Sequence, residues 1–423
     1  MNRRELMQWG LLAGSALVTR DALAVDMPVV APGGQRGVVT PNGASLQWKV
    51  VNGVKVGHLV AHELDHEFAP GLKAKVWGYN GSSPGPTLEV TEGDKVRLYV
   101  TNRLPEPTTV HWHGVILPNG MDGVSGLTQK PIKPDETFLY EFTFKRAGTF
   151  MYHPHYDEMT QMALGMMGMI VVHPRSPRGP KVDRDFALMS HEWSIEPGAA
   201  RPDPNAMDDF NLLTFNSKAF PATAPLVMGL GERVRIRIGN LSPMDHHPIH
   251  LHGVSAELTW TDGGEVPPSA RHPETTFLVP VGSVRVFEFV TTEPGDWAMH
   301  CHMTHHVMNQ MGHGFPVMVG ADAQKIDRRV KALVPNYMTM GHDGMGAMSE
   351  MNMPAPTNSI PMRGGKGPFS SIDMGGMFTV LKVRERPNEA DPDGWYQHPK
   401  GTVADVAPAD RLAADGIDPS RRV

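Results

Sequence analysis

The sequence predicts an all-β protein built from two β-sandwich domains and an irregular methionine-rich tail. Short runs that alternate apolar and polar residues recur at regular spacing and are separated by turn-forming residues, the pattern of a β-sandwich or barrel. The 423 residues exceed the length of one typical domain. The last part of the chain is rich in Met, Gly and Pro, so a packed core is not expected there.

The first domain is predicted over residues 45–176 and the second over residues 177–330. Alternating runs lie at residues 72–77, 87–90, 95–100 and 137–142 in the first domain, and at 186–189, 234–238, 275–279 and 284–290 in the second. The Pro- and Gly-containing stretch 175–180 is interpreted as the hinge between them.

The N-terminus is typical of an export signal. Arg3 and Arg4 precede an apolar run at residues 9–18, and Ala22-Leu23-Ala24 supplies a cleavage site with small residues. We interpret residues 1–24 as a twin-arginine-type signal peptide, which predicts a periplasmic or otherwise exported protein. A basic amphipathic start is the alternative. Residues 25–44, rich in Pro and Gly, are interpreted as a linker.

Composition limits the partners. The net charge of −6 gives no indication of a nucleic-acid partner. The apolar run 9–18 is too short to cross a bilayer, and no later run reaches spanning length, so no membrane span is predicted. Cys301 is the only cysteine, which excludes an internal disulfide and favours a thiolate protected by a metal.

Four His-x-His pairs indicate a metal cluster: His111/His113, His153/His155, His250/His252 and His300/His302. Chance placement of 21 histidines predicts about one such pair. On an extended segment each pair presents both imidazoles on one face. Eight imidazoles are too many for one metal and suit a cluster of about three.

The stretch at residues 300–311 predicts a second kind of site. It follows a strand-like run and a Pro-Gly turn, and alternation on a strand directs Cys301 away from the face of His300 and His302. A blue-copper centre requires a thiolate, two histidines and a weak axial thioether. Cys301, His306 and Met311 supply three of these four ligands, and His247 is the candidate for the fourth.

These four segments resemble, in order, the four copper motifs of the multicopper oxidases, the laccase-like family. The segments are 111–114, 153–155, 247–253 and 300–311, and the resemblance covers about residues 45–320. It implies two cupredoxin-like Greek-key β-sandwich domains and four coppers per chain. The implied type 1 ligands are Cys301, His247, His306 and axial Met311. The implied type 2 ligands are His111 and His250, and the type 3 pair falls to His113, His153, His155, His252, His300 and His302.

The resemblance also implies the chemistry. A small reductant gives single electrons to the type 1 site, Cys301 passes them to the cluster, and dioxygen is reduced to water. Asp122 matches an acidic position of the family, where a carboxylate accepts and relays protons; a plain Asp-Gly turn is the alternative. Some relatives carry a proton-donating glutamate where this chain has Val307, and Asp157 and Glu158 are candidate substitutes.

The tail, residues 331–423, is densest in methionine between residues 338 and 377. Exposed thioethers suit Cu(I), although incidental methionine in a linker is the alternative. Residues 377–383 are strand-like and are expected to pack on a domain. The extra histidines His58, His62, His66, His246 and His305 are interpreted as surface residues.

The sequence therefore predicts an exported oxidase that couples one-electron oxidation of Cu(I), phenols or other metal ions to dioxygen reduction, with a role in copper tolerance. Two domains with four cluster histidines each further predict a homotrimer with the clusters at its interfaces, since two-domain members of the family assemble in this way. A copper nitrite reductase and a copper-binding protein without turnover are the alternatives.

Overall fold

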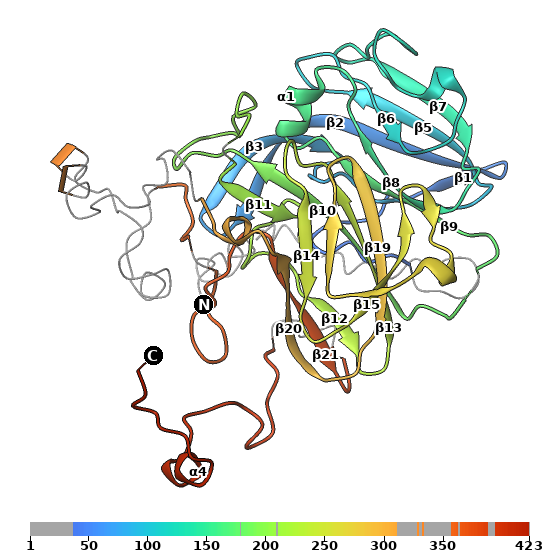
Figure 1. The fold of residues 1–423 in the computed structure, drawn as a ribbon. Helices are drawn as coiled ribbons and strands as arrows, with labels where there is room; N and C mark the ends of the chain where they lie inside the picture. The colour runs from blue at the N-terminus through green and yellow to red at the C-terminus, as the bar shows by residue number, and fades with distance from the viewer. Residues whose placement is uncertain are drawn as a thin grey trace, which may run out of the picture.

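The computed structural model describes residues 37–177, 179–208, 210–310, 328–329, 332–333, 357–362, 364–387 and 394–422. In this part of the chain the regular structure is almost entirely β, as predicted, and forms two β-sandwich domains (Figure 1). The signal peptide prediction lies outside the described residues, as do Met311 and most of the methionines of the tail.

The first domain packs two sheets face to face. One sheet has the order β1-β2-β5-β7, with β3 also paired to β2, and the other has the order β4-β9-β8-β6. The strands of the first sheet are β1 (Lys49–Val51), β2 (Val54–Ala69), β3 (Leu72–Tyr79), β5 (Lys95–Asn102) and β7 (Thr137–Thr143). Those of the second are β4 (Leu88–Thr91), β6 (His111–His113), β8 (Gly148–His153) and β9 (Gly168–His173).

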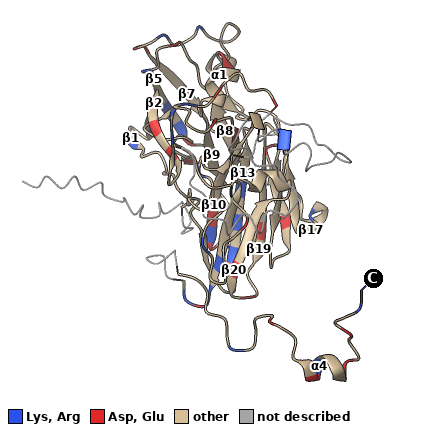
Figure 2. Cartoon of the chain, turned by 90° about the vertical axis from the view of Figure 1, so that its left-hand side faces the viewer, with Lys and Arg blue, Asp and Glu red and all other residues tan. Residues whose placement is uncertain are grey.

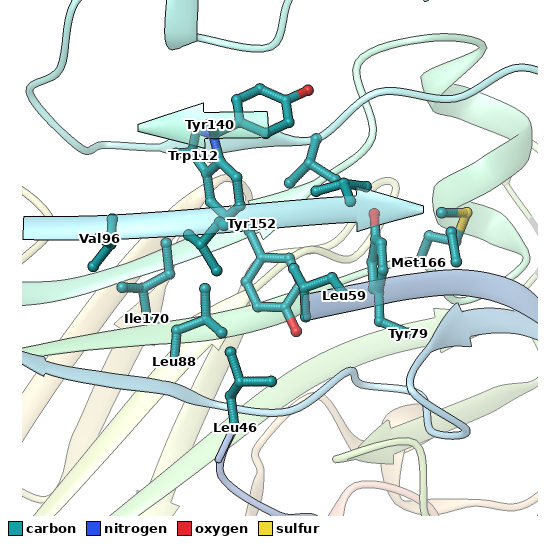
Figure 3. Close-up of a cluster of buried hydrophobic side chains, with 14 of the residues drawn as sticks. Leu46, Leu59, Tyr79, Leu88, Val96, Trp112, Tyr140, Tyr152, Met166 and Ile170 are labelled. Carbon is teal, nitrogen blue, oxygen red and sulfur yellow. The ribbon is translucent and has the colours of Figure 1, made fainter. Parts of the chain in front are cut away.

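The core between these sheets is aliphatic and aromatic (Figure 3). Trp112, Tyr140 and Tyr152 are all within it and at most 2 % exposed. The ring of Trp112 contacts that of Tyr140 at 5.2 Å between centroids. Burying aromatic rings of this size is a dominant stabilising term, so β6 and β8 are firmly anchored in the domain.

The second domain also packs two sheets. One has the order β11-β10-β13-β19-β15-β16, with β17 paired to β15, and the other has the order β12-β21-β20-β14-β18. The strands of the first are β10 (Arg184–Trp193), β11 (Leu212–Phe215), β13 (Arg233–Asn240), β15 (Ala256–Thr261), β16 (Gly264–Glu265), β17 (Pro273–Glu274) and β19 (Ser283–Val290). Those of the second are β12 (Leu226–Gly229), β14 (His247–Leu251), β18 (Thr276–Val279), β20 (Gly295–Cys301) and β21 (Phe378–Arg384).

Strand β21 comes from the tail yet lies inside the second domain. It pairs in parallel with β12 and antiparallel with β20, and Figure 1 shows it between them. The expectation that this segment packs on a domain is therefore confirmed, and the second domain extends beyond residue 330. The boundary at 176/177 falls in the connection between β9 and β10.

The described helices are short: α1 (Glu158–Ala163), α4 (Ala409–Ala414), η1 (Asn119–Met121), η2 (Pro268–Ala270) and η3 (Thr304–Val307). Within the described ranges, no helix combines the length and apolar character needed to cross a membrane. In the view of Figure 2, positive and negative residues are interspersed along the coloured strands.

The two domains share an apolar interface. Its buried residues include Phe68, Val76 and Met151 from the first domain and Met189 and Trp193 from the second. Part of the predicted linker joins it, because Val38 belongs to this cluster and the neighbouring Val39 bridges to β10. The described end of that segment, residues 37–44, therefore packs against the domains and is not a free linker.

A buried ion pair lies at the same interface. Arg237 on β13 donates two hydrogen bonds of 2.7 Å to Asp185 on β10 and one of 2.6 Å to Thr149 of the first domain. Burial alone would raise the pKa of Asp185, but the charges of Arg237 and Arg235 hold it below its usual value. The pair is fully satisfied, which is the condition for a buried charge to be tolerated.

We expect Asp185→Asn to lower the free energy of unfolding by roughly 3–5 kcal/mol, because it leaves the buried charge of Arg237 unpaired. Glu141→Gln is the matched control: Glu141 pairs with Arg97 at 3.0 Å on the surface, and its loss should cost at most about 1 kcal/mol. Denaturant unfolding of both variants measures the difference. Equal effects would show that the buried pair does not stabilise the interface.

Candidate metal centres

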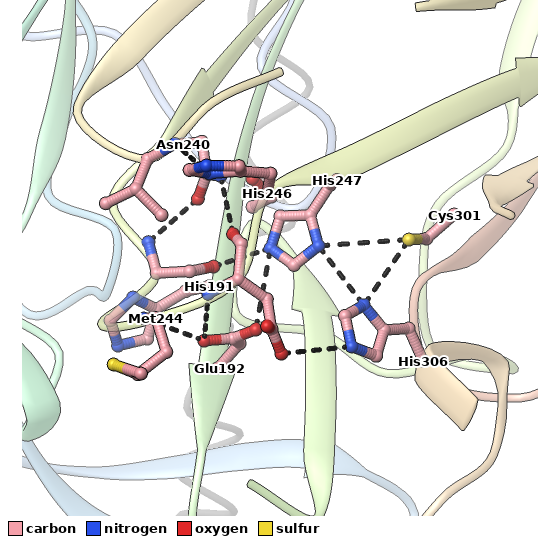
Figure 4. A network of polar contacts seen from close by, with 12 residues as sticks. His191, Glu192, Asn240, Met244, His246, His247, Cys301 and His306 are labelled. Atoms are coloured by element: carbon pink, nitrogen blue, oxygen red, sulfur yellow. Dashed lines mark hydrogen bonds and ion pairs between the residues drawn. The ribbon is translucent and has the colours of Figure 1, made fainter. Parts of the chain in front are cut away.

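The predicted type 1 ligands meet around Cys301. This residue ends β20, His247 begins β14, and His306 lies in η3. Cys301 Sγ lies 3.4 Å from Nδ1 of His306 and 3.8 Å from Nδ1 of His247, and the two nitrogens are 3.2 Å apart (Figure 4). The same three residues form one of the metal-ligand groupings among the described residues.

This geometry fits a copper ion. Two unprotonated ring nitrogens and a thiolate that converge on one point make the nitrogen and sulfur donor set of a blue-copper centre. Burial lowers the pKa of His247 well below its usual value, so the imidazole is neutral and can bind a metal. Burial raises the pKa of the Cys301 thiol to about 12, so metal binding must displace its proton.

Polar side chains contact Nε2 of both His247 and His306, the ring nitrogens that face away from Cys301. Ser242 Oγ lies 2.7 Å from Nε2 of His247, and Asp245 Oδ2 lies 3.2 Å from Nε2 of His306. Such partners fix the ring orientation and direct each Nδ1 towards the metal. Burial and the neighbouring Asp245 raise the pKa of Glu192, also part of this network, to about 8.

The first cluster half-site lies on β6 and β8. These strands pair with His111 opposite His153 and Trp112 opposite Tyr152. Since Trp112 and Tyr152 fill the core, the histidines lie on the other face. Ring centroids of His111 lie 5.4–5.7 Å from those of His113, His153 and His155, so all four predicted ligands of this domain form one group.

Hydrogen bonds select the nitrogens that face the site. His111 donates from Nδ1 to the carbonyl of Asp122 at 2.8 Å, and His153 does the same to the carbonyl of Pro154 at 2.8 Å, which leaves Nε2 of both rings available. His113 instead turns Nδ1 to within 3.2 Å of Nε2 of His153. Burial lowers the pKa of His153 to about 3, so this ring stays neutral.

Two carboxylates border this half-site. Asp122 Oδ1 lies 3.5 Å from Nδ1 of His111, so this carboxylate lies near the histidine group as predicted. Glu158 Oε1 lies 3.4 Å from Nδ1 of His153, and its other oxygen lies 3.8 Å from Nε2 of His155. Asp157, the other sequence candidate, accepts a hydrogen bond from Thr160.

The second half-site lies on β14 and β20. His250 pairs with His300 in register, and Ile249 pairs with Cys301. The ring of His250 lies 4.7 Å from that of His252, 5.7 Å from that of His300 and 5.4 Å from that of His302. His252 and His302 are exposed, and Nε2 of His252 lies 3.2 Å from Nε2 of His300.

The described ring contacts of the eight cluster histidines fall into two groups, one in each domain. Ring contacts join histidines inside each group of four, whereas no described ring contact joins one group to the other. The second half-site is instead linked to the thiol site, because His300 and His302 are covalent neighbours of Cys301 on opposite sides of it. The predicted division of the two faces of β20 is therefore what the structure shows.

Other predicted residues have mixed outcomes. Met311 lies outside the described residues, and Val307 is buried. His246 and His305 are exposed, as expected, but His66 is not a surface residue. Its Nε2 lies 2.6 Å from the carbonyl of Ser217, 151 residues away, and burial lowers its pKa to about 4.

Sequence reasoning missed Glu192, Ser242 and Asp245. Glu192 is a carboxylate inside a strand whose ten residues are all buried in the structure. A buried carboxylate requires a partner or a function. Asp245 and Ser242 precede His247 in a loop, and no periodic pattern marks them.

Comparison with known proteins identifies the family. Two family models, both described as multicopper oxidase, match residues 61–177 and 196–321. The chain belongs to the multicopper oxidase family. One matched segment falls in each cupredoxin domain, and together they contain all twelve candidate ligands, Met311 included.

Individual relatives cover parts of the chain. Copper resistance protein A of Escherichia coli is 44 % identical over 117 residues, which is 28 % of this chain and 19 % of that protein. The match thus spans about a fifth of the length of such curated relatives. The solved multicopper oxidase mgLAC shows 26 % identity and a TM-score of 0.58 over 82 % of this chain and 90 % of its own. A copper nitrite reductase from Nitrosomonas europaea shows 26 % identity and a TM-score of 0.52 over 59 % and 89 %.

We expect Cys301→Ser to abolish the blue absorption of the copper-loaded oxidase, because a hydroxyl cannot replace the thiolate ligand. His305→Ala is the control, since this neighbour of His306 is exposed. Visible absorption and copper content of both variants test the assignment. A blue band that persists without the thiol would contradict it.

Proposed function

We propose that this chain is an exported oxidase that takes single electrons from a small reductant beside His306 and delivers them to dioxygen, which becomes water. Copper supplies the one-electron redox chemistry and the affinity for dioxygen when it is bound. His247, Cys301 and His306 would hold the type 1 ion, and the two histidine groups would hold one type 2 ion and two type 3 ions. The signal-like N-terminal residues 1–24 support a periplasmic location as part of this proposal.

The observation that carries the proposal is the covalent link at the end of β20. Cys301 contacts His306 and His247 on one face, while His300 lies within 5.7 Å of His250 on the other. One peptide bond therefore separates a ligand of the electron-accepting site from a ligand of the dioxygen site. This arrangement supports electron transfer through bonds and requires no moving part.

Protons must accompany the electrons, because reducing one dioxygen to two waters consumes four of each. Asp122 and Glu158 are the carboxylates in contact with the first histidine group. Both are partly exposed, so they can exchange protons with water. We assign Asp122 to proton relay. Glu158 takes the role of proton donor, because Val307 stands at the family's glutamate position and has no ionisable group.

The surroundings of His306 support a cationic or phenolic electron donor. Asp245 contacts Nε2 of His306 at 3.2 Å while its side chain is 41 % exposed, so it reaches from the protein surface to a type 1 ligand. Exposed Met244 precedes Asp245 in sequence, and exposed Met303 lies three residues before His306. Thioether groups suit Cu(I), which with the methionine-rich tail supports a role in copper tolerance.

Two other functions remain as rivals. The likeness to a copper nitrite reductase favours the first, but a histidine on each side of Cys301 supplies more ligands than one further copper requires. The second is copper binding without turnover. Copper analysis, combined with oxygen uptake on addition of Cu(I), phenols or Fe(II), tests the proposal. Four coppers per chain without oxygen uptake from any donor would favour storage, and nitrite consumption would favour the reductase.

We expect Asp245→Ala to lower kcat/KM for Cu(I) oxidation about tenfold, the scale of losses when a partner of a ligand histidine is removed. Asp65→Ala is the control, since Asp65 lies on the exposed side of β2 with 80 % of its side chain accessible. Steady-state oxygen uptake with Cu(I) as donor measures the effect. Equal rates for the parent and Asp245→Ala would show that this carboxylate does not take part in electron donation.

We further propose that the active unit is a homotrimer in which the first half-site of one chain meets the second half-site of the next. The lack of a described ring contact between the two groups supports this, as does the exposure of His252 and His302. A complete cluster needs both groups, and head-to-tail contacts related by a rotation close into a ring.

Complementation tests the trimer. Chains carrying His113→Ala and chains carrying His302→Ala should each be inactive, while co-expression should restore part of the oxygen uptake. In a ring, some interfaces join an intact first domain to an intact second domain; in a monomer, every cluster lacks a ligand. No recovery in mixed oligomers of confirmed composition would contradict the interface model.

A further inference from the structure

The segment that leads into β21 passes between two type 1 ligands. Met377 accepts a backbone hydrogen bond from Cys301 at 3.1 Å and donates one to the carbonyl of His306 at 3.0 Å. Gly375 donates to the carbonyl of Val307 at 2.6 Å. The backbone of Met377 is thus fixed against the thiolate residue on one side and the second histidine on the other.

Asn309 holds this segment in place. Its side chain accepts a hydrogen bond from Gly376 at 2.8 Å and donates to the carbonyls of Phe220 and Pro361. A Cβ on Gly376 would lie 2.5 Å from the carbonyl of His306, so only glycine permits this close approach. The position of Met377 relative to Cys301 is therefore determined by packing and hydrogen bonds.

Met377 and Cys301 lie on the same face of the sheet. In the register of β20 and β21, His300 pairs with Phe378, so Cys301 stands opposite Met377. Opposite residues of an antiparallel pair have side chains on one face, with Cβ atoms about 5 Å apart. Both side chains are fully buried and belong to the same core cluster, together with Leu381 and Val383 of β21.

Other methionines in this region have different positions. Met299 belongs to the same cluster but pairs with Leu251. It therefore lies two residues further than Cys301 from the end of β20 that is close to His247 and His306. Met374, three residues before Met377, packs with Phe220, Phe378 and Val380 in the cluster on the other face of β21. Among the described methionines, Met377 alone combines the face of Cys301 with backbone bonds to Cys301 and His306.

We propose that Met377 supplies the thioether at the type 1 site, the position predicted from the sequence for Met311. The chain contains the pattern Met-Gly-x-x-Phe-x-Val twice, at residues 311–317 and 374–380. The second copy leads into β21, which pairs with the Cys301 strand, and only this copy has a methionine at its fourth position. A soft, polarizable thioether there suits the weak fourth ligand of a blue-copper centre.

The test compares Met377→Leu with Met311→Leu and Met374→Leu in the full-length, copper-loaded protein. Leucine conserves volume and polarity, so each variant should fold, and thermal unfolding of the metal-free form verifies this. The readouts are the reduction potential of the blue site and its electron paramagnetic resonance spectrum. We expect Met377→Leu to keep the blue band but raise the potential, because loss of a thioether donor disfavours Cu(II). Met374→Leu and Met311→Leu should match the parent.

The inference rests on the proposed function, and the two can fail separately. A parent protein without a blue band would contradict the proposed function itself. A blue parent whose potential and spectrum change with Met311→Leu or Met374→Leu, but not with Met377→Leu, would overturn only the assignment of Met377.

Discussion

The antiparallel pairing of β14 and β20 is the constraint on which both metal centres depend. Ile249 opposite Cys301 and His250 opposite His300 set which face of the sheet each side chain occupies. A slip of one residue would exchange the faces, moving the thiol to the outer side and the imidazoles into the core. The register is secured by the apolar residues Ile249, Leu251 and Met299, which are fully buried on the inner face. The core of the second domain thus positions the chemistry on both of its sides.

The interface between the domains restricts the movement of the two histidine groups relative to each other. It is apolar and extensive, and the buried pair of Arg237 and Asp185 crosses it through Thr149. Contacts of this kind oppose a change in the relative position of the domains, because such a change would expose buried apolar surface to water. The same contacts therefore stabilise the chain and fix the two histidine groups relative to each other.

Local patterns in the sequence predicted what is determined locally. Alternation alone separated Cys301 from His300 and His302, and paired histidines at a spacing of two marked both half-sites. The carboxylates Glu192 and Asp245 could not be found in this way, because they are brought together across 53 residues by the pairing of distant strands. Similarly, His66 alternates like a surface residue, yet its burial is decided by Ser217 in the other domain. Long-range contacts of this kind leave no periodic trace in the sequence.

The place of β21 in the sheet affects how the protein is made. The first domain can bury its own core as soon as residues 45–173 have been synthesised, since domains fold as units from the N-terminus. The second domain cannot complete its sheet until residue 384 has left the ribosome, because β21 lies between β12 and β20. Until then the edge of β20 is unpaired, and the thiol of Cys301 is open to oxidation during synthesis. A chain that stops before β21 would therefore contain every histidine of the two half-sites and still expose its single cysteine.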